Sequence, residues 1–404
     1  MFLSLLERRN PAFLQAAAEL HRSGAIPPNS YVLDLDAIER NARAFASEAE
    51  RLGLKAFAMT KQIGRNPDAS AAIRRGGITH AVGVDLQCAL AAAAGGLAAG
   101  HVGHLVQIPR HETDTAIALR PLFWTVFSEE KAHEAAAAAR RAGVVQDVLV
   151  RLSAPGDRFY RGHEGGFPAG DVVAVADMID AIEGLRFAGV TSFPATLFDA
   201  ESGTARSTPN LATLSRAKEA LLAAGREHVE LNAPGTTSVA ILETLAAAGA
   251  TQVEPGHGLT GTTPLHAVAD LVEEPAVAYV TEVSHLVDGS AFVFGGGLYA
   301  DPVLAGVGTD ALLVGADGDV SAATRRRVEM PAADAIDYYA AIPLEGTPVA
   351  SGDTVLMGFR PQAFVTRALT VGIRGISSGA PQVAGVWAAD GSAPLGLDQI
   401  EGAR

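Results

Sequence analysis

The sequence contains a single cysteine, Cys88, among 404 residues. One thiol excludes a disulfide framework and a zinc site built from cysteines, and it fits a reducing cytoplasm. Basic residues are also scarce, since 31 lysines and arginines stand against 45 acidic residues and the formal net charge is −14. Nucleic-acid surfaces need clustered lysine and arginine, so we expect no nucleic-acid partner.

Long apolar runs are missing as well. None reaches the length that spans a bilayer, so we expect no membrane partner. The first residues, MFLSLLERRNPAFLQ, carry charge and proline where a secretory signal needs an unbroken apolar region. We therefore expect a cytoplasmic protein. Hydrophobic residues form 48% of the chain, which indicates a globular protein, and its length predicts two domains.

Short β-type runs alternate with alanine-rich helical segments through the first two thirds of the chain. Eight unbroken alternations favour a closed (β/α)8 TIM barrel, of class α/β, over an open doubly wound sheet. The predicted strands are 54–59, 78–84, 102–108, 121–127, 145–152, 185–192, 228–232 and 250–254.

After about residue 270 the sequence is rich in β-type runs with glycine and proline turns, interrupted by a helical segment, PAADAIDYYAAI. We predict an N-terminal helical extension over 1–30, a barrel over 31–268 and a mainly β C-terminal domain over 269–404. The strand at 31–36 is expected to join the β domain.

Lys61 stands where the first barrel strand, LKAFAM, ends and the chain turns. For any single lysine, an ordinary surface position is the simpler explanation. Active sites of these barrels, however, lie at the carboxyl ends of the strands. A lysine there can act as a nucleophile if burial or a nearby cation lowers its pKa, and Arg65 could be that cation or a phosphate ligand.

The predicted seventh strand ends in LNAPGTTS, which contains Asn232, Gly235 and Thr236. Small residues and hydroxyls before a helix suit an anion, because free N–H groups and the helix dipole point at it. A plain strand-to-helix turn with a threonine cap explains the same residues equally well.

The predicted eighth strand ends in VEPGHGLTG, where Glu254 follows apolar residues. A buried carboxylate needs a partner, either a neighbouring basic side chain or a protonated cofactor nitrogen. Gly256 and His257 come next, in a turn whose backbone N–H groups could face a ligand. A lysine, a phosphate loop and a carboxylate on one rim indicate pyridoxal 5′-phosphate (PLP), with the Schiff base at Lys61.

The order of these motifs resembles the alanine-racemase-like PLP enzymes of fold type III, over nearly the whole chain. YVLDLDAIERNARAF is similar to that family's opening, KAFAMTK to its lysine strand, LNAPGTT to its phosphate loop and EPGHGLTG to its Pro-Gly segment. SGDTVLMG is similar to a stretch of its β domain, and FGGGLYADP resembles the YhfX-like group. The resemblance implies a homodimer with shared active sites, an amino-acid substrate, and racemisation or epimerisation in which Lys61 moves the α-proton.

The sequence departs from the family's pattern at several site positions. Glu254 replaces the arginine that alanine racemases place on the pyridine nitrogen, and it matches the Glu-Pro-Gly-Arg motif of related decarboxylases. Arg65 replaces a phosphate-binding tyrosine, and Ser192 or Phe193 replaces a ring-stacking histidine. The family's second base, a tyrosine of the partner's β domain, aligns with Phe294.

Two-base racemisation needs an acid–base group opposite Lys61. Tyr299 is our candidate for that group and His285 the alternative. In GDRFYRGHEGGF, Arg161 or Arg158 would be the family's arginine near the cofactor oxygen, although a glycine-rich lid explains this segment equally well.

Decarboxylation, a lyase reaction, and PLP binding without catalysis remain alternatives. The family's basic-amino-acid decarboxylases carry a β-domain cysteine, its metal-dependent D-threonine aldolases carry a histidine near the C-terminus, and its non-catalytic members lack the β domain; none of these patterns fits. A sugar-phosphate barrel enzyme without PLP would not need Glu254. His101 and His104 could form a metal pair, but they fall at a predicted strand start, so we predict no metal site.

Overall fold

The computed structural model describes residues 1–299, 309–315, 317–332 and 334–396. The chain forms two compact units. The barrel unit comprises Ala42–Met59 and Ile73–Gly258, and the β unit comprises Met1–Asn41, Thr60–Ala72 and Leu259–Arg404. Within the described residues, no helix has both the length and the apolar character needed to cross a membrane.

Eight parallel strands of the barrel unit close into a ring, because the first and last of them pair with each other. The ring confirms the predicted (β/α)8 barrel. In order around it lie β2 (Lys55–Ala58), β3 (His80–Gly83), β4 (Ala98–Val102), β5 (Phe123–Val126), β6 (Gln146–Ser153), β8 (Leu185–Thr191), β11 (Glu230–Asn232) and β12 (Gln252–Val253).

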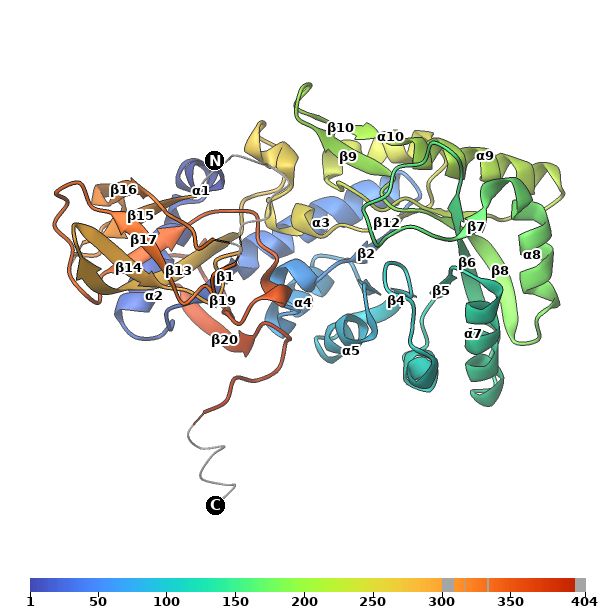
Figure 1. The fold of residues 1–404 in the computed structure, drawn as a ribbon, viewed down its shortest axis with the longest axis horizontal. Coiled ribbons are helices and arrows are strands. Elements are labelled where there is room, and N and C mark those ends of the chain that lie inside the picture. Colours follow the sequence, from blue (N-terminus) through green and yellow to red (C-terminus); the bar gives the residue numbers. More distant parts are fainter. Residues whose placement is uncertain (300–308, 316, 333, 397–404) are drawn as a thin grey trace, which may run out of the picture. The chain divides into compact units, whose positions relative to one another are not determined.

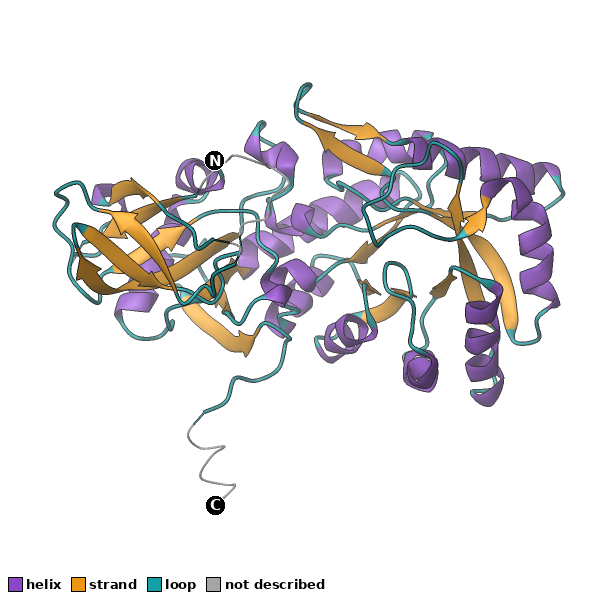
Figure 2. Ribbon diagram, viewed as in Figure 1, coloured by secondary structure: helices purple, strands orange, loops and turns teal. Residues whose placement is uncertain are grey.

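Helices follow the barrel strands and cover their outer side. Figure 1 shows α7, α8 and α9 outside β6 and β8, and Figure 2 shows the same alternation of helix and strand by colour. The helices are α3 (Leu35–Arg51), α4 (Pro67–Arg75), α5 (Leu86–Ala94), α6 (Thr113–Ala118), α7 (Glu129–Arg141), α8 (Val172–Ala181), α9 (Pro209–Ala223) and α10 (Leu242–Ala247), with short strands β7 (Phe167–Pro168), β9 (Thr196–Asp199) and β10 (Thr204–Ser207) between some of them.

The predicted strand at 102–108 is wrong, because β4 is Ala98–Val102. Gly103 has a φ of +75°, which ends the strand, and Val106 is half exposed. The true strand begins with Ala98, Ala99 and Gly100, small residues with weak β propensity, so its sequence gives little signal. Packing selects them, because a Cβ at Gly100 would lie 2.5 Å from the Phe57 ring.

The sheet of the β unit is mixed. β1 (Ser30–Asp34) pairs antiparallel with β13 (Val277–Val287) and parallel with β19 (Leu369–Arg374). The remaining strands are β14 (Ser290–Phe294), β15 (Asp310–Val314), β16 (Thr324–Arg327), β17 (Tyr339–Pro343), β18 (Thr354–Met357) and β20 (Gln382–Ala388). The segment 331–342, predicted to be helical, contains β17 instead, because its second half pairs with β14.

An apolar core holds this sheet against two N-terminal helices, α1 (Phe2–Arg9) and α2 (Pro11–Arg22). Leu14 of α2 belongs to one fully buried cluster with Val280, Leu356 and Val371 of the sheet. Burial of each such side chain contributes about 1.5–3 kcal/mol, so the extension is part of the β unit's core.

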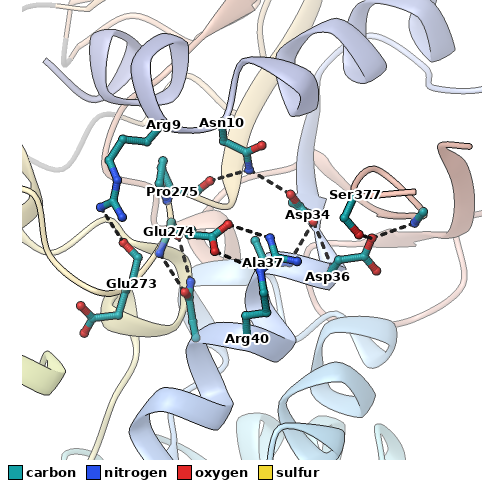
Figure 3. Close-up of polar contacts among 12 residues, drawn as sticks. Arg9, Asn10, Asp34, Asp36, Ala37, Arg40, Glu273, Glu274, Pro275 and Ser377 are labelled. Carbon is teal, nitrogen blue, oxygen red and sulfur yellow. Dashed lines mark hydrogen bonds and ion pairs between the residues drawn. The ribbon is translucent and has the colours of Figure 1, made fainter. Parts of the chain in front are cut away.

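Polar contacts join the same helices to the start of α3 (Figure 3). Asn10, between α1 and α2, donates to Asp34 Oδ2 (2.9 Å) and to the Pro275 carbonyl (3.0 Å). Asp34 Oδ1 accepts from the backbone N–H of Ala37 (3.0 Å), which caps the first turn of α3. Arg40 forms a two-bond ion pair with Glu274 at 2.6 and 3.0 Å.

Candidate active site

Glu254 follows directly on β12 and is buried at the carboxyl end of the barrel. Its Oε1 atom accepts two hydrogen bonds, from Asn232 Nδ2 at 2.9 Å and from His101 Nδ1 at 2.8 Å. Its Oε2 atom lies 3.4 Å from His104 Nε2. Asn232 is the last residue of β11 and His101 lies on β4, so strands on both sides of Glu254 position this carboxylate.

The contacts of Glu254 favour its ionised form. Burial alone would raise the pKa of this carboxyl, but His104, His101 and Asn232 outweigh burial and hold the pKa below its usual value. A buried carboxylate that stays ionised is suited to pair with a protonated nitrogen of a ligand.

The ligand-binding atoms of His101, His104 and Glu254 all lie within 4.8 Å of one another. A metal ion could bridge such a set, so the prediction of no metal site stays a prediction. The contacts of both imidazoles with the Glu254 carboxylate also account for their positions without a metal ion.

The loops after β11 and β12 approach each other closely. A Cβ at Gly258 would lie 2.6 Å from the Thr237 carbonyl oxygen, so only glycine permits the approach. Gly235 bridges to Thr196, and Thr236 donates its backbone N–H to the Thr196 carbonyl (3.0 Å). Among the described residues, the buried Ser238 hydroxyl has no hydrogen-bond partner. This pair of loops is where (β/α)8 barrels commonly bind phosphate.

Other predicted residues of the barrel unit take different positions. Ser192 is fully buried and accepts from Asn210 Nδ2 at 3.2 Å. Gly256 is partly exposed, and the buried His257 opens a short 3-10 helix, His257–Thr260. Arg161 has a side chain that is 98% exposed and pairs with Glu164.

Arg151 on β6 is the buried arginine that the sequence analysis missed. Its guanidinium lies over the rings of Phe127 (4.7 Å) and Phe159 (5.4 Å) and donates to the His163 carbonyl. Its Nε and Nη1 atoms are buried without a hydrogen-bond partner in the described chain. Burial lowers the pKa of Arg151 to about 10. The signal in the sequence was a charge inside an apolar strand, VLVRL.

An aromatic group lies near these residues at the barrel mouth. The Phe193 ring has its centroid 6.0 Å from Tyr160, 5.9 Å from His163 and 6.3 Å from His104. The segment after β6, which contains Tyr160 and His163, therefore packs on Phe193, one of the two candidates for the position of the family's ring-stacking histidine.

Lys61 and Arg65 belong to the β unit. Lys61 begins a 3-10 turn, Lys61–Ile63, three residues after β2 ends at Ala58. Its Nζ lies 5.6 Å from the centre of the Phe364 ring, and the Arg65 guanidinium lies 5.9 Å from it. Phe364, which the sequence analysis did not single out, thus receives two cations on one ring.

Met59, which precedes Lys61 by two residues, lies at the same end of the barrel as Glu254. In the barrel unit β2 and β12 are neighbours, and the Met59 backbone N–H donates to the Pro255 carbonyl at 2.8 Å. Lys61 follows Met59 by two residues and Glu254 precedes Pro255 by one.

Tyr299 and His285 are both exposed on the β unit. The backbone N–H of Tyr299 donates to Gly297, and the His285 ring stacks on Phe292 with centroids 4.9 Å apart. Their assignment as acid–base groups stays a prediction.

Comparisons with known proteins agree with this geometry. A family model described as "Alanine racemase, N-terminal domain" matches residues 33–264, and one described as "YhfX-like, C-terminal domain" matches 278–383. The chain is 37% identical over 386 residues to the uncharacterized protein YhfX of Escherichia coli (strain K12), which covers 95% of this chain and 97% of that protein.

Two solved structures share the fold. D-threonine aldolase from Filomicrobium marinum has a TM-score of 0.66 at 18% identity, covering 90% of this chain and 95% of its own. Alanine racemase of Clostridium difficile 630 has a TM-score of 0.62 at 14% identity, covering 90% and 99%. At these identities the likeness concerns the architecture, and one architecture supports both a lyase and a racemase.

Proposed function

The chain belongs to the alanine-racemase-like family, in its YhfX-like group, and from that membership we propose that it is a PLP-dependent amino-acid racemase or epimerase. The observation that carries the proposal is Glu254, a buried carboxylate held ionised at the carboxyl end of the barrel.

The residues present fit PLP. Glu254 offers an anionic acceptor for a pyridine N–H, and Lys61 offers an amine for covalent attachment. The buried Ser238 hydroxyl and the loops at Gly235 and Gly258 suit a phosphate group. When bound, PLP withdraws electrons from the α-carbon of an attached amino acid and makes its α-proton acidic.

The chain's own residues would then handle the proton. Lys61 Nζ would accept or return the α-proton on one face, and Phe364 would keep that amine near an aromatic surface. Tyr299, or else His285, would serve the opposite face from the β domain of a partner subunit, in a homodimer with shared sites. Arg151 would bind an anionic oxygen of cofactor or substrate through its two unsatisfied N–H groups.

A lyase reaction is the second candidate, because the fold is shared with D-threonine aldolase. Glu254 favours it as well. A protonated pyridine ring withdraws electrons more strongly and would support cleavage at more than one bond of the α-carbon.

The first test identifies the lysine. Wild type, Lys61→Ala and the control Lys55→Ala are loaded with PLP, reduced with borohydride, digested and analysed by mass spectrometry. We expect the reduced cofactor on the peptide that contains Lys61 in wild type and control, and on no peptide of Lys61→Ala. Lys55 is the matched control because it lies on β2, the strand that precedes Lys61, and is half exposed and paired with Glu230. Label elsewhere would contradict the proposal.

The second test identifies the reaction. The loaded enzyme is incubated with a panel of L- and D-amino acids in deuterated water, and the products are scored for α-deuterium, chirality and release of carbon dioxide, aldehyde or ammonia. Deuterium with inversion would establish racemisation or epimerisation. Bond cleavage without inversion would replace it with the lyase or decarboxylase alternative.

A further inference from the structure

Five buried side chains form a continuous hydrogen-bonded chain at the carboxyl end of the barrel. Thr125, His101, Glu254, Asn232 and Thr191 are each 6% exposed or less. They come from β5, β4, the end of β12, β11 and β8. The bonds are 2.5 Å between Thr125 and His101, 2.8 Å between His101 and Glu254, 2.9 Å between Asn232 and Glu254, and 2.8 Å between Thr191 and Asn232.

The donors and acceptors in this chain fix its direction. Thr191 donates to the Asn232 carbonyl oxygen, which turns the Asn232 amide N–H toward Glu254. An ionised carboxylate can only accept, so His101 must carry a proton on Nδ1. Both donors reach the same oxygen, Oε1, and the other oxygen, Oε2, is left facing His104.

The opposite ring nitrogen of His101 is also occupied. Its Nε2 lies 2.5 Å from the Thr125 hydroxyl, so the imidazole is held at both ends and cannot turn without losing a buried hydrogen bond. Within the described part of the barrel unit, the ionisable side chains that contact Glu254 are His101 and His104.

We propose that His101, oriented by Thr125, is a positioning residue that together with Asn232 saturates Oε1 of Glu254 and thereby leaves Oε2, beside His104, for the N–H of the cofactor ring. The inference rests on the proposed function, because the cofactor supplies that N–H. It adds which carboxylate oxygen receives the ring and which two side chains decide this. His101 does not touch the reacting atoms and acts through Glu254.

Three variants separate the links of the chain. Thr125→Val keeps the shape and removes the hydroxyl. His101→Asn keeps a donor where Nδ1 stands and loses the link to Thr125. His101→Leu removes both links. His80→Leu, on the neighbouring β3 but bonded only to Thr79, is the matched control.

The first readout needs no cofactor. In apoprotein labelled with 15N-histidine, we expect His101 to show a protonated Nδ1, assigned by its disappearance in His101→Asn. Glu254→Gln should change that signal and leave the signal of His80 unchanged. An unprotonated Nδ1, or a His101 signal that is the same in wild type and Glu254→Gln, would overturn the inference even if PLP binds at Lys61.

The second readout is the dissociation constant for PLP and the visible absorption of the bound cofactor. A hydrogen bond to a charged group corresponds to about a ten- to hundredfold change in affinity, so we expect a loss of that size in His101→Leu. Thr125→Val should lose less, and His101→Asn should recover most of the affinity and the wild-type spectrum. Equal loss in His101→Asn and His101→Leu would contradict the positioning role.

The two proposals fail in different ways. If Lys61 is not labelled by reduced PLP, the proposed function fails whatever the histidine signals show. If Lys61 is labelled and His101→Leu binds PLP like wild type, only the positioning role fails. Stoichiometric zinc in the purified protein, lost in His101→Leu, would also overturn it, because the same three side chains would then be metal ligands.

Discussion

Asp34 of the β unit and Glu254 of the barrel unit are both buried carboxylates, and their surroundings differ in kind. Among the described residues, the hydrogen-bond donors to Asp34 are neutral, namely the Asn10 amide and backbone N–H groups at the start of α3. Burial raises its pKa despite these bonds. Glu254 faces two histidines, and its pKa is lowered.

From this difference we infer that Asp34 has a structural role, and it supports the chemical role that we propose for Glu254. The bonds of Asp34 are all used in capping a helix and anchoring a loop, as Figure 3 shows. Glu254 caps nothing, and its carboxylate is held by side chains from other strands. A buried charge that is kept ionised without a structural task supports our proposal that Glu254 belongs to a functional site.

The largest expected effect comes from neutralising each carboxylate in turn. Glu254→Gln should lower activity of the PLP-loaded enzyme about a hundredfold or more, because the ring nitrogen loses its anionic partner. Asp34→Asn keeps a capping oxygen and should stay within about twofold of wild type. Steady-state kinetics on the substrate found in the panel measures both. Equal losses in the two variants would break the comparison.

Arg151 allows a second test, within the barrel unit, of the difference between a structural and a functional buried charge. Arg151→Met keeps volume and removes two unsatisfied buried N–H groups, so the free energy of unfolding should be unchanged or higher by about 1–3 kcal/mol. Activity should nevertheless fall at least about tenfold, as expected when a charged hydrogen bond to a ligand is lost.

Arg186→Met is the control for Arg151, since Arg186 lies on the neighbouring strand β8, has an exposed side chain and pairs with Asp147. Neither its activity nor its denaturation midpoint should change. A variant of Arg151 that is less stable and fully active would reverse our assignment of that residue.

Asp34→Ala tests the structural half of the comparison. Loss of the capping bonds and of the Asn10 contact should lower the free energy of unfolding by about 1–2 kcal/mol. The affinity for PLP should not change. Urea denaturation and a cofactor titration on the same preparation provide both numbers, and a loss of PLP affinity would show that Asp34 is not purely structural.

The smallest expected effect is on the pH dependence of stability, which should change with opposite sign in the Asp34 and Glu254 variants. The pKa of Asp34 is raised in the folded protein, so its ionisation reduces stability as pH rises above 3.8. Over that range the stability of Asp34→Asn should increase relative to that of wild type. The pKa of Glu254 is lowered, so its contribution is present above 4.5 and is lost as pH falls through the lowered pKa.

The stability of Glu254→Gln should therefore decrease relative to that of wild type as pH rises toward 4.5. Thermal melts of the apoproteins between pH 3 and 7 measure both differences. Slopes of the same sign for the Asp34 and Glu254 variants would contradict the assigned directions.

The sequence predicted the barrel because strand alternation is periodic. The roles of Lys61 and Glu254, inferred from the rule that active sites of this fold lie at strand ends, stay predictions. Arg151 was missed because an inward-facing charge in an apolar strand has no periodic signature. Arg151 can be recognised as a candidate site residue only in the structure, where its buried Nε and Nη1 atoms have no hydrogen-bond partner among the described residues.

His101 was missed for a different reason. The strand was predicted at 102–108, four residues too late, which put His101 at the start of the predicted strand, at the opposite end of the barrel from Glu254. The true strand begins with alanine and glycine, chosen for the space beside Phe57 and not for β propensity. Tertiary packing therefore determined where β4 begins and ends, and these bounds place His101 beside Glu254.

The protonation state of the cofactor ring tests the central claim most directly. PLP labelled with 15N at the ring is bound to wild type and to Glu254→Gln, and the ring nitrogen is observed by NMR. We predict a protonated ring nitrogen in wild type that becomes unprotonated in the variant. An unprotonated nitrogen in wild type, or one unaffected by Glu254→Gln, would contradict the role given to this carboxylate.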